Sequence, residues 1–158
     1  MRNSLWRETV QLPKIHGKNE NDETDVLIIG GGMAGVLCAY FLKQAGVDCL
    51  LIERRRIGSG ISGNTTAKIT SQHGLIYHKL EKSFSAEFAK GYWQAHEAAL
   101  AEYRMLSRQI PCDFETLDNF IYAARAKRLL EQEYATLMRL GIPAIFTEHL
   151  PLPLDTVG

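Results

Sequence analysis

The chain has 158 residues, of which 46% are hydrophobic, and this length predicts one domain, or one domain and a fraction, with a real core. Its 18 basic and 18 acidic side chains balance, so nothing indicates steering toward nucleic acid or an anionic membrane surface. The sequence contains neither an apolar run long enough to span a bilayer nor a signal-peptide segment at its N-terminus. We therefore expect a cytoplasmic protein without a membrane span.

Residues 1–24 are polar and have no regular period, and we interpret them as a surface arm leading into the first strand. Trp6 is the exception within this arm. Two readings of it stay open: the indole pins the arm to the body of the protein, or it is an incidental exposed aromatic.

The apolar run Val26 to Ile29 ends abruptly in glycines. Four consecutive large apolar residues, rich in β-branching, are typical of a strand covered on both faces, as in a parallel sheet. Gly30, Gly32 and Gly35 then follow the G-x-G-x-x-G spacing of the dinucleotide fingerprint. In that motif the glycines serve a tight turn, the close approach of a pyrophosphate, and the packing of helix against strand.

The next segment, from about Met33 to Ala45, is predicted to be a helix with most of its surface buried, because Lys43 is its single charged side chain. Gly46 supplies the stop signal at its C-terminus. We expect a phosphate to bind free backbone N–H groups at the start of this helix, around Met33 and Ala34, where the helix dipole is positive.

Val47 to Ile52 reads as a second parallel strand, and it ends in Glu53. An acid at this distance from the first glycine accepts hydrogen bonds from ribose hydroxyls. Because strand, glycines, helix, second strand and acid occur in order, we predict an adenine-dinucleotide site rather than a simple glycine turn. Glu53 also argues against a 2′-phosphate, although Arg54 to Arg56 keep that question open.

Residues 54–67 form a loop dense in glycine and in short hydroxyl or amide side chains, which can wrap closely around a ligand. Residues 68–74 follow with β-branched residues and alternating polarity, which suit a short extended segment next to the site. His73 lies at the end of that segment. It either belongs to the site or hydrogen-bonds a turn before Gly74.

No metal site is predicted. The remaining histidines have no cysteine or histidine partner at metal-ligand spacing. The cysteines, Cys38, Cys49 and Cys112, are scattered, and we expect reduced structural thiols.

The second half of the chain has a different pattern. We predict amphipathic helices over residues 85–109 and 126–140, and short strands over residues 114–117, 120–123 and 144–147. The expected apolar stripe of the first of these helices consists of Phe88, Tyr92, Ala95, Ala99, Tyr103 and Leu106. That of the second consists of Leu129, Leu130, Tyr134, Leu137 and Met138. The final residues, 150–158, read as a connection to a further element.

With the glycine turn, Glu53 and the Gly58-Ser59-Gly60-x-Ser62-Gly63-Asn64 loop in view, the chain resembles the FAD-dependent oxidoreductases of the D-amino-acid oxidase and glycine oxidase type. The stretch from Thr65 to Leu75 looks most like the bacterial subset whose longer members end in a Rieske iron–sulfur domain. The resemblance covers most of residues 25–154. It shifts the expected cofactor from NAD to FAD.

The resemblance implies a role for each candidate site residue. The pyrophosphate would bind at the glycine turn and the adenosine ribose at Glu53. The residues that border the pyrophosphate and the approach to the flavin ring would be Arg54, Ser62, Asn64 and Thr65. In this family the flavin accepts a hydride from a carbon bearing an amine. The implied substrate is therefore a small-molecule amine or amino acid, and no catalytic residue is assigned. The full set of predicted cofactor-binding residues is Gly30, Gly32, Met33, Ala34, Gly35, Glu53, Arg54, Ser62, Asn64, Thr65 and His73.

Members of this family are about two to three times as long and return to the nucleotide domain after an antiparallel substrate domain. We therefore interpret the chain as a truncated or split member that is inactive alone and whose partner is the missing C-terminal part.

The expected fold is α/β, the N-terminal part of a Rossmann-type FAD/NAD(P)-binding domain with the start of an antiparallel α+β substrate domain. The expected divisions are an arm (1–24), the FAD-binding part (25–110) and an incomplete substrate domain (111–158). The alternative is a non-catalytic dinucleotide-binding or remnant polypeptide.

Overall fold

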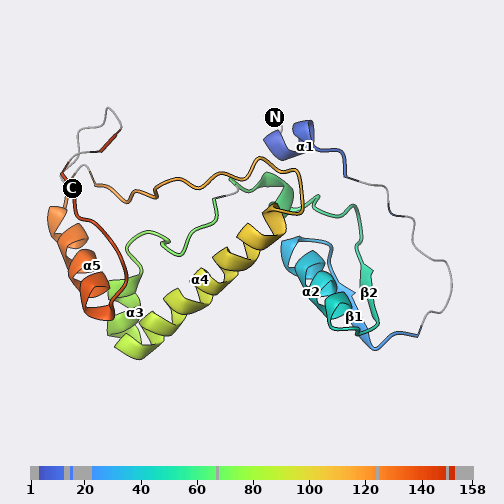
Figure 1. The fold of residues 1–158 in the computed structure, drawn as a ribbon, viewed down its shortest axis with the longest axis horizontal. Coiled ribbons are helices and arrows are strands. Elements are labelled where there is room, and N and C mark those ends of the chain that lie inside the picture. The colour runs from blue at the N-terminus through green and yellow to red at the C-terminus, as the bar shows by residue number, and fades with distance from the viewer. Residues whose placement is uncertain are drawn as a thin grey trace. The chain divides into compact units, whose positions relative to one another are not determined.

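The computed structural model describes residues 4–12, 15, 23–66, 68–123, 125–148 and 150–151. The chain divides into two compact units, Met1–Lys68 and Ile69–Gly158, and each is described by itself (Figure 1). Much of the predicted arm and nearly all of the predicted terminal connection lie outside the described residues.

The first unit is built around a β–α–β motif, as predicted. Strand β1 (Val26–Ile29) leads into helix α2 (Met33–Gln44), which returns the chain to strand β2 (Cys49–Ile52). The two strands are parallel and pair residue for residue along their whole length. Figure 1 shows α2 lying alongside the two strands, as expected for a crossover helix.

Helix α2 ends where the sequence predicts, because Gly46 adopts a left-handed conformation with φ of 74°. The Gly46 N–H donates to Lys43 O at 3.1 Å, and the Val47 N–H donates to Leu42 O at 2.9 Å. This pair of bonds satisfies the last carbonyl groups of the helix and turns the chain toward β2.

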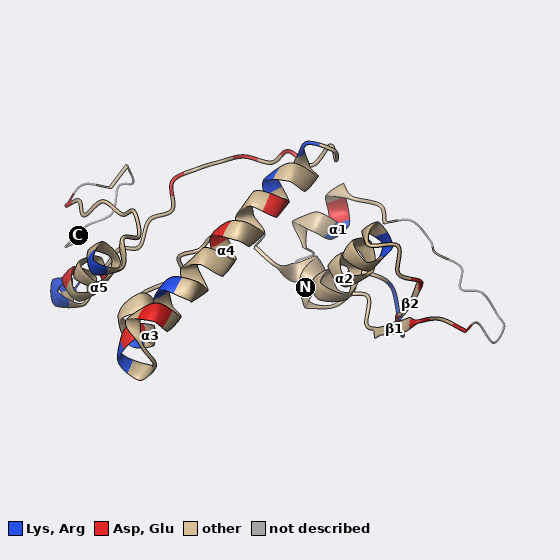
Figure 2. Ribbon diagram, turned by 60° about the horizontal axis from the view of Figure 1, so that its bottom comes forward, with Lys and Arg blue, Asp and Glu red and all other residues tan. Residues whose placement is uncertain are grey.

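The prediction that α2 is mostly buried is wrong, because none of its residues is buried in the structure. Figure 2 shows the helix without acidic residues, but the two described strands cover one side of it only. Cys38 is correspondingly exposed. The sheet is bare in the same way: Ile28 is 8% exposed, whereas Leu27 and Ile29, which point to the opposite face, are 52% and 80% exposed.

The described part of the arm differs from the prediction. It contains a short helix, α1 (Leu5–Thr9), where an irregular segment was expected. The Trp6 indole N–H donates to Thr65 O at 2.7 Å, next to the 3₁₀ turn η1 (Ile61–Asn64). The first reading of Trp6 is therefore confirmed: it pins the arm to the first unit.

The described residues of the second unit form three helices: α3 (Tyr77–Ser83), α4 (Ala86–Ser107) and α5 (Lys127–Leu140). The sequence predicted α4 and α5, but not α3. The Ser85 side chain caps α4 by accepting a hydrogen bond from Phe88 N at 3.0 Å. The core of this unit is formed by Tyr77, Ala89, Leu137, Leu140 and Ile142, with Ile76, Leu80, Tyr92, Trp93 and Ala144 packed against it.

The buried faces of α4 and α5 differ from the predicted stripes. On α4 the buried residue is Ala89, and Tyr92 and Trp93 pack against the core, whereas the predicted Phe88 is 48% exposed. On α5 the predicted Leu129 and Met138 are exposed. Its buried residues are Leu130, Glu133, Thr136, Leu137 and Leu140.

The predicted strands at 114–117, 120–123 and 144–147 are not formed in the described residues. Residues 113–123 are extended but irregular, and Asp113 has a positive φ of 48°. An isolated two-stranded hairpin is at best marginally stable, since it needs a third strand or a covering helix. The expected antiparallel pairing has no such support within the described part of the second unit.

Among the described residues, no helix combines the length and the apolar character needed to cross a membrane.

Tyr77 gives the second unit a pH-dependent stability. Its side chain is fully buried and its hydroxyl donates to Ser71 O. Burial raises the pKa of Tyr77 to about 12, above its ordinary value of 10.0. Because this pKa is raised on folding, the contribution to stability is full below about pH 10 and is lost as the pH rises toward about 12. Tyr77→Phe should lower the free energy of unfolding by about 1 kcal/mol at pH 7 and remove this loss. Thermal melting at pH 7, 10 and 11.5 checks both effects, and a Phe variant with the parent's pH profile would contradict them.

Candidate functional site

The glycine turn brings β1 and the start of α2 into close contact. Gly30 has φ of 110°, and its N–H donates to Ile52 O at 2.8 Å, which extends the parallel pairing into the turn. A Cβ atom on Gly35 would lie only 2.0 Å from Gly30 O. No side chain fits in that space, so Gly35 performs the packing role that the sequence predicts for it.

The other glycines of the turn differ in what lies above them. A Cβ on Gly31 would meet the Ile57 side chain at 3.0 Å and that of Glu53 at 3.1 Å. A Cβ on Gly32 would meet only Ser62 Oγ, at 3.3 Å. Gly31 is thus packed inside the turn, while Gly32 presents its backbone on the open side.

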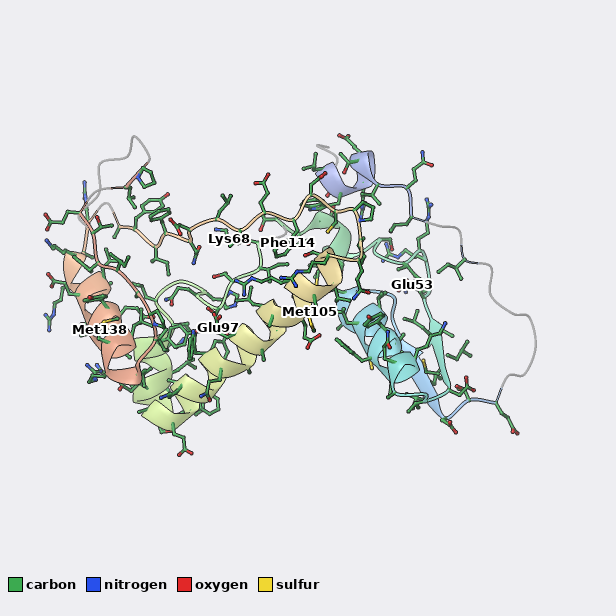
Figure 3. The ribbon with its side chains drawn as sticks, in the orientation of Figure 1. Glu53, Lys68, Glu97, Met105, Phe114 and Met138 are labelled. Atoms are coloured by element: carbon green, nitrogen blue, oxygen red, sulfur yellow. The ribbon has the colours of Figure 1, made fainter. Side chains whose placement is uncertain are left out.

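Glu53 lies immediately after β2 and reaches across to the glycine turn (Figure 3). Its Oε2 accepts a hydrogen bond from Gly31 N at 2.8 Å, and its Oε1 accepts one from Arg55 N at 2.8 Å. These two backbone hydrogen bonds, helped by the charges of Arg55 and Arg54, hold the pKa of the Glu53 carboxyl below its ordinary value. A carboxylate has about four acceptor sites, so two remain for ribose hydroxyls.

The loop after β2 folds back over the turn. The Gly58 N–H donates to Gly31 O at 2.8 Å, and Ser62 Oγ accepts from Met33 N at 2.9 Å. A Cβ on Gly63 would lie 2.2 Å from Gly58 O, so the loop closes tightly on itself. The loop thereby places a hydroxyl group at the start of α2.

The structure brings seven of the predicted site residues together at the end of the β–α–β motif: Gly30, Gly32, Met33, Ala34, Gly35, Glu53 and Ser62. The remaining ones have other contacts. Arg54 is exposed next to Glu53. Asn64 Nδ2 donates to Gly60 O at 3.0 Å and so stabilises the loop itself, and Thr65 offers its carbonyl to Trp6.

His73 belongs to the second unit, where its ring lies against that of His96 with centroids 5.1 Å apart. His96 Nδ1 in turn lies 2.8 Å from Tyr92 O. Gln72, the residue before His73, donates its amide N–H to Gly74 O at 2.7 Å, so the turn at Gly74 is stabilised by Gln72. Whether His73 takes part in the cofactor site remains a proposal.

Sequence analysis missed Glu133, the buried acid of the second unit, which is 3% exposed. Its Oε1 accepts from Tyr77 N and its Oε2 from His78 N, each at 2.8 Å. Glu133 therefore caps the start of α3 from another helix, and it also accepts from Gln72 Nε2 at 3.2 Å. The signal was present in the sequence, since Glu133 lies in the same helical stripe as Leu130 and Leu137.

The residues around Glu133 also border a cavity of about 280 Å³, which has mixed polar and apolar walls and is lined in part by Gln72, Asn119, Tyr134, Leu137 and Phe146. Groups of His, Cys, Asp or Glu side chains that could hold a metal ion do not occur in the described part of the chain.

A parallel β–α–β motif with a glycine turn, a following helix and an acid at the end of the second strand defines a dinucleotide-binding α/β protein. The comparisons with known proteins specify the class further. Residues 25–151 match the family described as DAO, FAD dependent oxidoreductase. The chain belongs to this family, as the sequence predicted, and the family's cofactor is FAD.

Two known proteins that are similar to the chain support this family assignment. The chain is 33% identical over 157 residues to a protein of Bacillus subtilis (strain 168), YhfW, whose name describes a Rieske 2Fe-2S iron-sulfur protein. It is 30% identical over 127 residues to the gamma-glutamylputrescine oxidoreductase of Escherichia coli (strain K12). These alignments cover 97% and 78% of the chain, but only 31% and 30% of the two relatives. No solved structure matches the chain significantly.

The residues at the turn fit the ADP half of FAD. The backbone N–H groups of Gly32, Ala34 and Gly35 have no hydrogen-bond acceptor within the described residues, and they lie at the positive end of α2. Within the described residues, a Cβ on Gly32 would meet no atom other than Ser62 Oγ within 4 Å. Together with the ionised Glu53, these groups match a pyrophosphate followed by a ribose.

The fit of Gly35 can be tested directly. Gly35→Ala should lower the free energy of unfolding of the first unit by about 2 kcal/mol, because its methyl group would overlap Gly30 O. Gly91→Ala, in the open interior of α4, is the matched control and should stabilise the protein by a few tenths of a kcal/mol to about 1 kcal/mol. Thermal melting distinguishes the two. Equal stabilisation by both substitutions would show that helix and strand do not approach closely at Gly35.

Proposed function

We propose that the first unit binds the ADP half of FAD, and that the complete protein is an FAD-dependent oxidoreductase acting on a small-molecule amine or amino acid. The observation that supports this proposal best is made at the C-terminal ends of β1 and β2. There the backbone N–H groups of Gly32, Ala34 and Gly35, which have no acceptor within the described residues, lie near the Glu53 carboxylate. Such a conjunction suits a pyrophosphate linked to a ribose. A loop rich in small residues covers the same strand ends.

In this proposal Gly32, Ala34 and Gly35 donate backbone N–H groups to the pyrophosphate, and Glu53 accepts from the ribose. Ser62, which accepts from Met33 N, helps to form the pyrophosphate rim. Arg54, Asn64 and Thr65 are the further residues of the first unit in the predicted set, and the role of His73, which lies in the second unit, stays a prediction. FAD, when bound, supplies the capacity to accept a hydride from a carbon that bears an amine.

The amine or amino-acid substrate is supported by the family and by the name of the Escherichia coli relative, a gamma-glutamylputrescine oxidoreductase. We further propose that residues 25–110 form the FAD-binding part and residues 111–158 the opening of an antiparallel substrate domain. The chain leaves about two thirds of each relative's length uncovered. Its partner would be a polypeptide equivalent to that uncovered part. The competing proposal is a dinucleotide-binding polypeptide without catalysis.

Nucleotide binding tests the proposed function. Equilibrium dialysis of the chain with FAD, ADP, NAD and NADP should show a preference for FAD and ADP over NADP, because Glu53 repels a 2′-phosphate. Gly32→Val should weaken FAD binding by about 1–3 kcal/mol, since its side chain would occupy the pyrophosphate position. Glu53→Gln should weaken it roughly tenfold through loss of a charge-assisted bond to the ribose. A clear NADP preference, or full affinity in Gly32→Val, would refute the site.

The bare face of the sheet supports the proposed partner. Leu27 and Ile29 are 52% and 80% exposed on the face opposite α2, and an exposed apolar strand surface promotes association. We expect the isolated chain to be oligomeric or poorly soluble and inactive toward amines, and to be rescued by the complementary polypeptide.

Light scattering tests this expectation. Leu27→Lys should reduce self-association without unfolding the protein, because Leu27 lies on the bare face. Ile28→Lys, the matched control, should unfold the first unit, because Ile28 is buried against α2. A soluble monomeric parent that oxidises a simple amino acid would contradict the need for a partner.

A further inference from the structure

The N-terminal helix α1 is attached to the loop of the dinucleotide site by two side chains from adjacent positions. The Trp6 indole N–H donates to Thr65 O at 2.7 Å, and the Arg7 guanidinium donates to Ser59 O. These two carbonyl groups flank the 3₁₀ turn η1 (Ile61–Asn64). Helix α1 therefore holds the loop at both of its ends.

These contacts account for the existence of α1. A helix of five residues is not stable by itself in water, since nucleation is costly and few backbone bonds are formed. All its residues are exposed, and its N-cap residue, Ser4, makes no side-chain cap. The contacts with the loop are thus the main described interactions that order the helix.

Arg7 and Leu12 also pack on the glycines that close the loop. A Cβ on Gly63 would lie 3.2 Å from Arg7 Nε, and one on Gly58 would lie 3.1 Å from Leu12 Cδ1. The same Gly63 position is only 2.2 Å from Gly58 O. The arm covers the place where the loop is narrowest.

The loop in turn reaches the site itself. Gly58 N donates to Gly31 O at 2.8 Å, and Ser62 Oγ accepts from Met33 N at 2.9 Å. A continuous series of contacts runs from α1 through η1 to the start of α2. A displacement of α1 would therefore remove contacts that hold the loop.

We propose that Trp6 and Arg7 are positioning residues of the dinucleotide site, and that α1 is a brace that fixes residues 58–65 over the glycine turn. The brace does not touch the nucleotide. It determines how long the nucleotide stays bound, because the loop has to open for release. This inference rests on the proposed binding of FAD. It gives the arm, which was expected to lie outside the site, a role in that binding.

The charge of Arg7 is consistent with this position. Among the described residues it forms no ion pair, so its guanidinium is held by a carbonyl group alone. A cation beside a loop that borders a pyrophosphate raises the local positive potential. Both ion pairs found among the described residues, Lys127–Glu148 and Arg139–Glu81, lie in the second unit, so neither of them neutralises Arg7.

The test uses the full chain with two substitutions and a matched control. Trp6→Phe keeps an aromatic ring and removes the N–H donor, and Arg7→Gln removes the guanidinium. Glu8→Gln changes an exposed neighbour in the same helix, whose side chain forms no hydrogen bond or ion pair with the described residues. FAD dissociation is followed by fluorescence after dilution, and amide hydrogen exchange of the ligand-free chain is followed by mass spectrometry.

We expect Trp6→Phe and Arg7→Gln each to release FAD about threefold to tenfold faster than the parent, the range for loss of one hydrogen bond. Exchange should quicken in residues 57–66 and stay unchanged in β1 and α2, with Glu8→Gln like the parent in both measurements. Faster exchange throughout the first unit would show a general effect on stability and overturn the proposal. If the parent binds FAD and the two variants release it at the parent's rate, the proposal is also overturned.

The two proposals can fail separately. If the parent binds neither FAD nor ADP, the proposed function of this chain is wrong, and the brace is then judged by hydrogen exchange alone. Local quickening in residues 57–66 of Trp6→Phe would support the brace in that case. Parent-like exchange there would refute it.

Discussion

The close approach of α2 to the end of β1 is the constraint on which the site depends. With no side chain on Gly35, the first turn of the helix lies against Gly30 O, at a distance where a Cβ atom would be only 2.0 Å away. This contact places the positive end of the helix at the C-terminal end of β1. The N–H groups of Gly32 and Ala34, at the start of this helix, have no hydrogen-bond acceptor within the described residues. A larger residue at position 35 would tilt the helix away and would misdirect these donors.

The electrostatics of the site follow from this geometry. Two of the donors near the turn, Gly31 N and Met33 N, are satisfied by Glu53 and Ser62. The chain thus supplies its own oxygen acceptors, one charged and one neutral. The Glu53 carboxyl, whose pKa is lowered first of all by the Gly31 hydrogen bond, stays ionised at neutral pH. It therefore combines two tasks, holding the glycine turn and accepting from a ribose.

The first unit was largely predictable from its sequence, and the second was not. The run Val26 to Ile29, the spacing of Gly30, Gly32 and Gly35, and the stop at Gly46 are local signals, and each corresponds to the observed element. Burial was harder to predict, because it depends on partners. Helix α2 reads as buried from its lack of charge, yet the two described strands cover one side of it only.

The missed helices, α1 in the first unit and α3 in the second, have the same origin. Helix α3 is capped by Glu133, which is far away in sequence, and α1 is held by contacts of Trp6 and Arg7 with a distant loop. No local pattern encodes such contacts. The expected hairpin at 114–117 and 120–123 has suitable strand-forming residues, but a hairpin alone is marginal. Of the site residues, those defined by the glycine motif, and Glu53 and Ser62, come together, whereas His73 lies in the other unit.

Hydrogen exchange of the chain with and without ADP measures the central claim most directly, because it locates the bound nucleotide on the sequence. We expect saturable protection of peptides that contain residues 30–36 and 53–65, with α5 unchanged as an internal reference. Protection confined to the second unit, around the cavity beside Glu133, or no protection at saturating ADP, would contradict the assignment of the glycine turn as the dinucleotide site.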